Sequence, residues 1–191
     1  MSNTNYYMQA EEIEGLINEM YQALKTRLDM QKITNPAIIG IHTGGVWLAE
    51  RLHQMLKIEE PMGILDISFY RDDFSRVGVN PEVRPSNIAF EVEDQHIILV
   101  DDVLQTGRTI RAAMNEIFDY GRPASITLVT LVERGGRELP IQPNVVGVRP
   151  PLNQEQHITL TGPEPLSLVI GESKHEARDE TEEQGGPGEQ E

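Results

Sequence analysis

Short apolar segments alternate with amphipathic segments of helical period along most of this 191-residue chain. Apolar residues recur at three- and four-residue spacing in the amphipathic segments, which predicts helices over residues 13–28, 46–56 and 110–118. The apolar segments predict strands over residues 37–41, 64–69, 96–100 and 126–132. Strands that alternate with helices in this way form parallel sheets, because each crossover places its helix on a face of the sheet. We therefore predict an α/β fold with a central parallel sheet flanked by helices.

The last part of the chain has a different pattern. Shorter extended segments follow the last predicted helix and strand, at residues 145–148, 157–160 and 166–170. We predict that they form a small hood or antiparallel extension beside the main sheet. The final residues are rich in acids and lack large aliphatic side chains, so burial does not offset the entropy of ordering them. The sequence thus predicts a folded domain over residues 1–171 and a disordered acidic tail over residues 172–191.

The charge of the chain limits its partners. Asp and Glu number 31 against 16 Lys and Arg, which gives a formal net charge of -15. This charge disfavours RNA and anionic membranes, since both are bound through cationic side chains. The sequence has no cysteine, no apolar run long enough to cross a membrane, and no signal-peptide pattern at its start. A cytoplasmic protein is the default expectation.

A polar turn with glycine and threonine precedes the helix predicted over residues 110–118. Gly107 permits close approach of the backbone, Thr106 and Thr109 offer hydroxyl groups, and the helix N-terminus attracts anions. Arg108 adds positive charge. The turn is therefore a candidate phosphate site, although Thr106 also fits a plain helix cap. It is neither a Walker loop nor a dinucleotide fingerprint, because the chain lacks both glycine patterns.

Asp101 and Asp102 stand side by side between the strand at residues 96–100 and this turn. Adjacent carboxylates repel each other, so their position at the rim of a core needs a physical reason. The two neighbouring hydroxyl groups of a ribose supply one, because each carboxylate accepts a hydrogen bond from one of them. The simpler alternative is that the two acids are an exposed pair in a loop. For an Asp-Asp pair considered without its neighbouring residues, this alternative is favoured.

Residues 97–109, IILVDDVLQTGRT, resemble the binding motif of the type I phosphoribosyltransferases, which use 5-phosphoribosyl 1-diphosphate (PRPP). The segments at residues 65–76, 107–123 and 131–147 are similar to one branch of this family, the PyrR proteins. PyrR proteins are bifunctional pyrimidine operon regulators and uracil phosphoribosyltransferases. The resemblance covers residues 8–170. It implies the type I phosphoribosyltransferase fold, with a central parallel sheet flanked by helices, a small hood and a mobile loop.

The resemblance also implies roles for particular residues. Asp101 and Asp102 would be catalytic by holding the ribose hydroxyls, together with Arg71 in the mobile loop at residues 70–84. Further residues would bind substrate through the pyrophosphate, the sugar phosphate and the nucleobase. They are Thr43, Gly44 and Gly45 for pyrophosphate; Val103, Leu104, Gln105, Thr106, Gly107, Arg108 and Thr109 for the sugar and its phosphate; and Arg134, Arg137 and Ile158 for the base.

The implied reaction displaces pyrophosphate from PRPP by uracil and yields UMP, with regulation of pyrimidine genes as a second role. Mg²⁺ would be carried mainly by the diphosphate, with no set of protein metal ligands, and the protein would be a homodimer or higher homo-oligomer. Two alternatives stay open: transfer to another base, and an RNA-binding attenuation regulator that senses UMP or UTP with weak or no catalysis. The pyrophosphate loop departs from many relatives, because His42 and Gly44 replace cationic residues.

Overall fold

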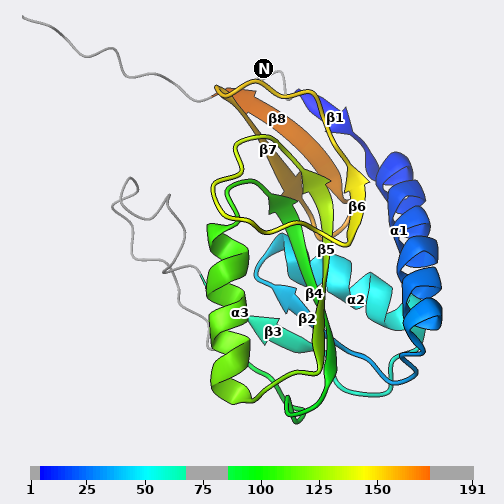
Figure 1. The fold of residues 1–191 in the computed structure, drawn as a ribbon. Coiled ribbons are helices and arrows are strands. Elements are labelled where there is room, and N and C mark those ends of the chain that lie inside the picture. The colour runs from blue at the N-terminus through cyan, green and yellow to red at the C-terminus, as the bar shows by residue number, and fades with distance from the viewer. Residues whose placement is uncertain (1–4, 68–85, 173–191) are drawn as a thin grey trace, which may run out of the picture.

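The computed structural model describes residues 5–67 and 86–172. Its main sheet has five strands in the order β3-β2-β4-β5-β6 (Figure 1). The strands are β2 (Ala37–Ile41), β3 (Gly63–Leu65), β4 (His96–Leu104), β5 (Ser125–Glu133) and β6 (Val145–Val148). Every neighbouring pair in this sheet runs parallel. The parallel α/β sheet predicted from the alternation is confirmed.

Helices cover both faces of the main sheet (Figure 1). On one face, α1 (Ala10–Gln31) and α2 (Gly44–Leu56) share a core cluster with Val100 of β4. On the other face, α3 (Arg108–Tyr120) shares a second cluster with Leu99. Successive side chains of β4 therefore supply opposite cores, as the pleat of a strand requires. No helix in the described part of the chain is long and apolar enough to cross a bilayer.

Two details of the predicted elements are wrong. The apolar spacing that predicts this helix includes both Ile117 and Phe118, but the Phe118 side chain of α3 is 54% exposed. Ile117 is buried as predicted, and one step along a helix turns the side chain by about 100°. β3 is also shorter than predicted, because it ends at Leu65. Residues 68 and 69 of the predicted strand lie outside the described residues.

β6 belongs to the main sheet, which corrects the prediction that residues 145–148 contribute to the hood. Val145 pairs with Val129, and Val148 pairs with Val132. Gly147 lets the two strands fit closely, since a Cβ there would lie 2.6 Å from the carbonyl oxygen of Leu131. A strand of four residues carries too little periodic pattern to indicate which sheet it joins.

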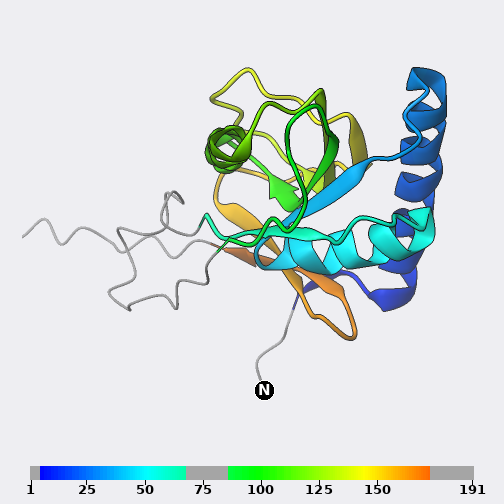
Figure 2. The same cartoon turned by 90° about the horizontal axis from the view of Figure 1, so that it is seen from below.

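A second, antiparallel sheet forms the hood, with the strand order β1-β8-β7 (Figure 2). Its strands are β1 (Tyr6–Met8), β7 (Gln156–Thr161) and β8 (Ser167–Glu172). The sequence predicts the β7–β8 pair but not β1, which is three residues long. Ile158 and Leu160 join the core cluster of α1 and α2, so the hood packs on the main domain. The predicted tail starts at the last residue of β8, and residues 173–191 lie outside the described residues.

Candidate functional site

The acid pair lies within β4 and not in the loop that the sequence predicts after residue 100. β4 continues to Leu104, and Asp101 pairs with Thr130 of β5. The strand extends this far because β5 is equally long and offers it partners. On its other side, pairing with β2 stops at Val100. The end of β4 is thus supported on one side and open on the other, and the two acids stand at this open edge.

Short local hydrogen bonds orient both carboxylates. The backbone N–H of Asp102 donates to Oδ1 of Asp101 at 3.0 Å. The backbone N–H of Val103 donates to Oδ1 of Asp102, also at 3.0 Å. Asp101 is buried, with 4% of its surface exposed. Carboxylates held in a fixed orientation are suited to accept hydrogen bonds from a ligand that brings hydroxyl groups.

The glycine loop at the start of α2 lies directly against the acid pair. A Cβ on Gly44 would fall on the carboxylate of Asp102. A Cβ on Gly45 would lie 2.5 Å from the carbonyl oxygen of Val100. The imidazole Nδ1 of His42 and the hydroxyl of Thr43 are 2.7 Å apart, and the peptide bond between these residues is cis. Both glycines are therefore needed for α2 to dock on β4.

The turn between β4 and α3 has the geometry of an anion cradle. Gly107 precedes α3 with φ of 92°, a conformation that favours glycine. The Thr106 hydroxyl accepts a hydrogen bond from the backbone N–H of Arg108 at 3.2 Å. The Thr106 carbonyl is anchored by the N–H groups of Glu138 and Leu139. The first turn of α3 thus directs its unpaired N–H groups toward the end of β4.

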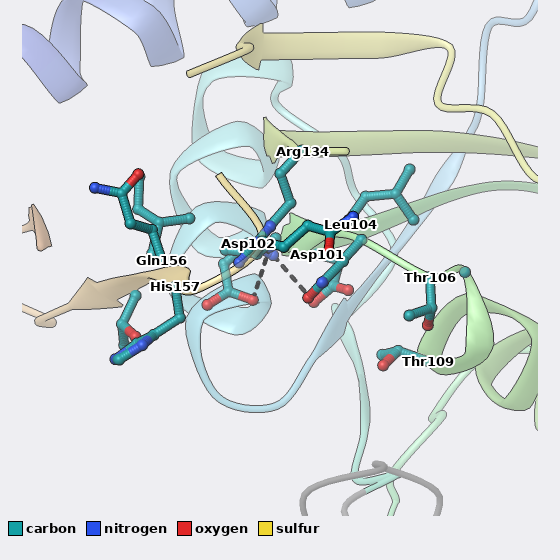
Figure 3. A pocket seen from close by; sticks show the side chains of 14 residues that line it. Asp101, Asp102, Leu104, Thr106, Thr109, Arg134, Gln156 and His157 are labelled. Atoms are coloured by element: carbon teal, nitrogen blue, oxygen red, sulfur yellow. Dashed lines mark hydrogen bonds between the residues drawn. The ribbon is translucent and has the colours of Figure 1, made fainter. Parts of the chain in front are cut away.

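The acid pair and the turn open into a cavity of about 560 Å³ (Figure 3). We call residues 101–109 the strand-end wall and residues 154–159 the hood wall. Arg134 follows β5, and in the close view of Figure 3 Gln156 and His157 lie on one side of Asp101 and Asp102, with Thr106 and Thr109 on the other side. The cavity is lined by Asp101, Asp102, Val103, Leu104, Gln105, Thr106, Gly107, Thr109, Arg134, Gln154, Gln156, His157, Ile158 and Thr159.

Some predicted site residues do not line this cavity. The Arg108 side chain turns to Glu138, with Nη2 2.7 Å from Oε2. Arg137 donates from Nη2 to Oε1 of Glu133 at 2.8 Å. Thr43, Gly44 and Gly45 lie in the loop beside Asp102 without contributing to the lining. Arg71 lies outside the described residues.

Arg134 is the Arg side chain that lines the cavity among the described residues. It is buried, with 8% of its surface exposed, and this burial lowers the pKa of its guanidinium. One Nη2 hydrogen bond reaches the carbonyl oxygen of Asn153 at 3.4 Å. Nε is buried without a hydrogen-bond partner among the described residues. A guanidinium with an unsatisfied buried donor is suited to a carbonyl or anionic oxygen of a ligand.

The sequence missed most of the hood wall, namely Gln154, Gln156, His157 and Thr159. The apolar positions Ile158 and Leu160 predict that His157 and Thr159 point away from the core. This alternation does not indicate which part of the molecule, or which ligand, His157 and Thr159 contact. His157 rests against Gly171 of β8, because a Cβ on Gly171 would collide with the imidazole.

The donor set matches a magnesium ion that is carried by a substrate. Among the described residues, no three His, Asp or Glu side chains gather closely enough to hold a metal. The carboxylates that face the cavity are Asp101 and Asp102. Mg²⁺ keeps several waters and commonly binds one or two carboxylates together with substrate phosphates. The site fits Mg²⁺ in that form.

Comparison with known proteins agrees with this geometry. A family model described as the phosphoribosyl transferase domain matches residues 4–162. A hypoxanthine phosphoribosyltransferase from Trypanosoma cruzi superposes with a TM-score of 0.65 at 19% identity, covering 89% of this chain and 93% of that chain. A hypoxanthine-guanine phosphoribosyltransferase from Bacillus anthracis gives 0.63 at 15% identity, covering 79% and 86%. The fold is that of a phosphoribosyltransferase, and the family model shows a phosphoribosyl transferase domain in this chain.

Relatives with higher identity narrow this class. The bifunctional protein PyrR of Nitrosococcus oceani is 56% identical over 160 residues, which are 83% of this chain and 90% of the relative. The bifunctional protein PyrR of Pseudomonas fluorescens is 56% identical over 155 residues, which are 81% and 92%. The chain therefore belongs to the PyrR family of phosphoribosyltransferases.

Proposed function

We propose that the protein is a uracil phosphoribosyltransferase that converts uracil and PRPP to UMP and pyrophosphate. One observation carries this proposal: a single cavity joins the acid pair, the anion cradle and Arg134. These groups match the hydroxyls, the 5-phosphate and the base of a nucleoside monophosphate. The cavity volume of about 560 Å³ suits a ligand of this size. The choice of uracil follows from membership of the PyrR family.

Each part of the cavity has a proposed role. Asp101 and Asp102 accept hydrogen bonds from the ribose hydroxyls, and the backbone of residues 103–109 receives the sugar phosphate. The glycine loop at residues 43–45 binds the leaving pyrophosphate, for which Arg71 is a further proposed contact. The base lies between Arg134 and the hood wall, where the backbone at Ile158 meets its edge. Arg137 is a more distant contact, because Glu133 engages it.

The chemistry is a substitution at the anomeric carbon of the ribose. The bond from uracil N1 to that carbon forms, the bond to the diphosphate oxygen breaks, and the N1 proton passes to solvent. Positive charge develops on the sugar, so the fixed carboxylates of Asp101 and Asp102 stabilise the transition state electrostatically. Mg²⁺ carried by the diphosphate would supply positive charge that neutralises the leaving group, beside the carboxylates of Asp101 and Asp102. No covalent nucleophile is needed.

The proposal is tested by pyrophosphate release from PRPP with Mg²⁺, with and without uracil. We expect uracil-dependent release that falls by about two to three orders of magnitude in Asp102→Asn, because the variant loses the negative charge beside the sugar. Hypoxanthine, guanine, xanthine and orotate serve as competing bases. Turnover of a purine alone would disprove the assignment of uracil.

A second function, RNA-binding regulation, is part of the description of the PyrR family. Here the exposed cation Arg149 is paired with Glu133 at 2.8 Å, which offsets its positive charge. Filter binding to a pyrimidine-operon leader RNA at low and moderate salt would test it. Tight, salt-sensitive and UMP-enhanced binding supports a regulator, and weak binding without a salt dependence opposes one.

The remaining expectations belong to the same proposal. A homodimer or higher homo-oligomer and a cytoplasmic location both follow from the resemblance to PyrR proteins. Light scattering coupled to size exclusion measures the first, and cell fractionation measures the second. A monomer at micromolar concentration would contradict the expected assembly.

A further inference from the structure

The β7–β8 hairpin of the hood spans from the cavity to α2. β7 begins at the cavity, where Gln156 and His157 belong to the hood wall. It ends at Thr161, and the hairpin turn follows at residues 162–166. This turn lies beside α2 (Figure 2). The hairpin therefore contacts the substrate cavity with one end and a helix of the main domain with the other.

The Trp47 side chain contacts the hairpin turn at Gly162. A Cβ on Gly162 would lie 3.1 Å from Cε3 and Cζ3 of the indole, so the ring is in contact with the turn backbone. The Trp47 side chain is half-buried and packs against the core cluster of α1 and α2. It stands in the first turn of α2, immediately after the glycine loop. The helix that places the glycine loop beside Asp102 thus also carries the hairpin turn.

The guanidinium of Arg51 forms a hydrogen bond to the same turn. Its Nη2 donates to the carbonyl oxygen of Pro163 at 3.2 Å, and its Nη1 donates to that of Trp47 at 3.1 Å. Its Nε donates to Glu14 of α1 at 3.1 Å. The guanidinium is planar and directs its donors rigidly, so it fixes three segments relative to one another. The ion pair with Glu14 is partly exposed and contributes little by itself.

We propose that Trp47 and Arg51 are positioning residues that fix the position of β7 relative to the cavity. Through this position they determine the affinity for the nucleobase. This rests on the proposed function, which places the base against the hood wall. α2 is docked on β4 through Gly44 and Gly45, so the hairpin inherits a fixed position relative to the acid pair. A shift of the turn would move the hood wall and leave the strand-end wall in place. A remote displacement of about 1 Å costs up to about a hundredfold in a well-aligned site.

The test compares a ligand that has a base with one that lacks it. Calorimetry would measure the affinity of UMP and of PRPP with Mg²⁺ for the full chain, Arg51→Met and Trp47→Phe. We expect Arg51→Met to weaken UMP roughly five- to tenfold and to leave PRPP within about twofold, since one hydrogen-bonded support is lost. Arg51→Lys keeps one donor to a carbonyl oxygen and should recover part of the loss. Glu14→Gln is the matched control, because it removes the ion pair but keeps both carbonyl bonds.

The outcomes separate this proposal from the function on which it rests. Equal weakening of UMP and PRPP, or no change of either in folded variants, would overturn the positioning role. Trp47→Phe keeps an aromatic ring and provides the comparison if Arg51→Met does not fold. Failure of the proposed function has another signature: the unmodified protein would bind UMP no tighter than ribose 5-phosphate and would not use uracil. That result would overturn both.

Discussion

The strand-end wall and the hood wall enclose one cavity but are built on different principles. In the strand-end wall, backbone N–H groups, a glycine and two carboxylates are fixed by the main sheet and by α3. In the hood wall, polar side chains come from the start of an antiparallel hairpin, in which Ile158 and Leu160 pack on the core. On the proposed function, the strand-end wall takes the sugar phosphate, which is the same for every base. The hood wall then selects among bases, with side chains that can be exchanged without disturbing the main sheet.

Among the variants that compare the two walls, the largest effect is expected at Gly44, which leaves no room for an added atom beside Asp102. In Gly44→Ala the new methyl group falls on the carboxylate of Asp102. We expect kcat/KM to fall by about a hundredfold or more, because the acid that faces the ribose is displaced. Steady-state kinetics with PRPP and uracil measure it. Gly15→Ala in α1 is the control, since a Cβ there meets nothing within 4 Å; loss of activity in that variant would show that the assay reports general damage.

Arg134 lies between the two walls, and its replacement distinguishes binding from stability. Arg134→Met retains most of the buried volume and removes a desolvated charge, so we expect thermal stability to be kept or raised. The affinity for UMP should fall by about tenfold or more, because a charged donor to the base is lost. Calorimetry and thermal unfolding of the same sample measure both. A destabilised variant with normal UMP affinity would make Arg134 a structural residue.

A pair of truncations, one in each wall, tests the comparison directly. Thr106→Ala removes a hydroxyl from the anion cradle and should weaken UMP and PRPP alike by about two- to tenfold. His157→Ala removes a ring from the hood wall and should weaken UMP alone, by a similar factor. The quantity to compare between the two variants is the ratio of the dissociation constant for UMP to that for PRPP. If His157→Ala weakens PRPP as much as UMP, the hood wall contacts the sugar phosphate and the division of labour is wrong.

The smallest effect is expected at Arg108. Its side chain is directed to Glu138, and its backbone N–H donates to the Thr106 hydroxyl in the turn. Arg108→Gln should therefore change the KM for PRPP by no more than about twofold, since exposed ion pairs contribute little. A rise of tenfold would show that the side chain swings into the cavity when phosphate is bound.

The residues explain which features were predictable from the sequence. The strands 37–41 and 96–100, buried on both faces, and the amphipathic helices carry strong local patterns, as does the segment from Asp101 to Thr109. Strand-end sites of this kind are local in sequence, so spacing predicts which residues come together. The hood wall was missed because its exposed side chains become part of a cavity only when the hairpin packs near β4, and no local sequence pattern indicates this packing. The place of β6 depends on close packing at Gly147, which no local period encodes.

The chain contains one tryptophan, and the structure places it under the hairpin turn at Gly162. The tryptophan emission of the unmodified protein therefore arises from one side chain, which lies at the contact between α2 and the hood. Ligands that occupy only the strand-end wall and ligands that also reach the hood wall can be compared optically without any attached label. A change in the emission of Trp47 would thus measure a change at the contact between α2 and the hairpin turn.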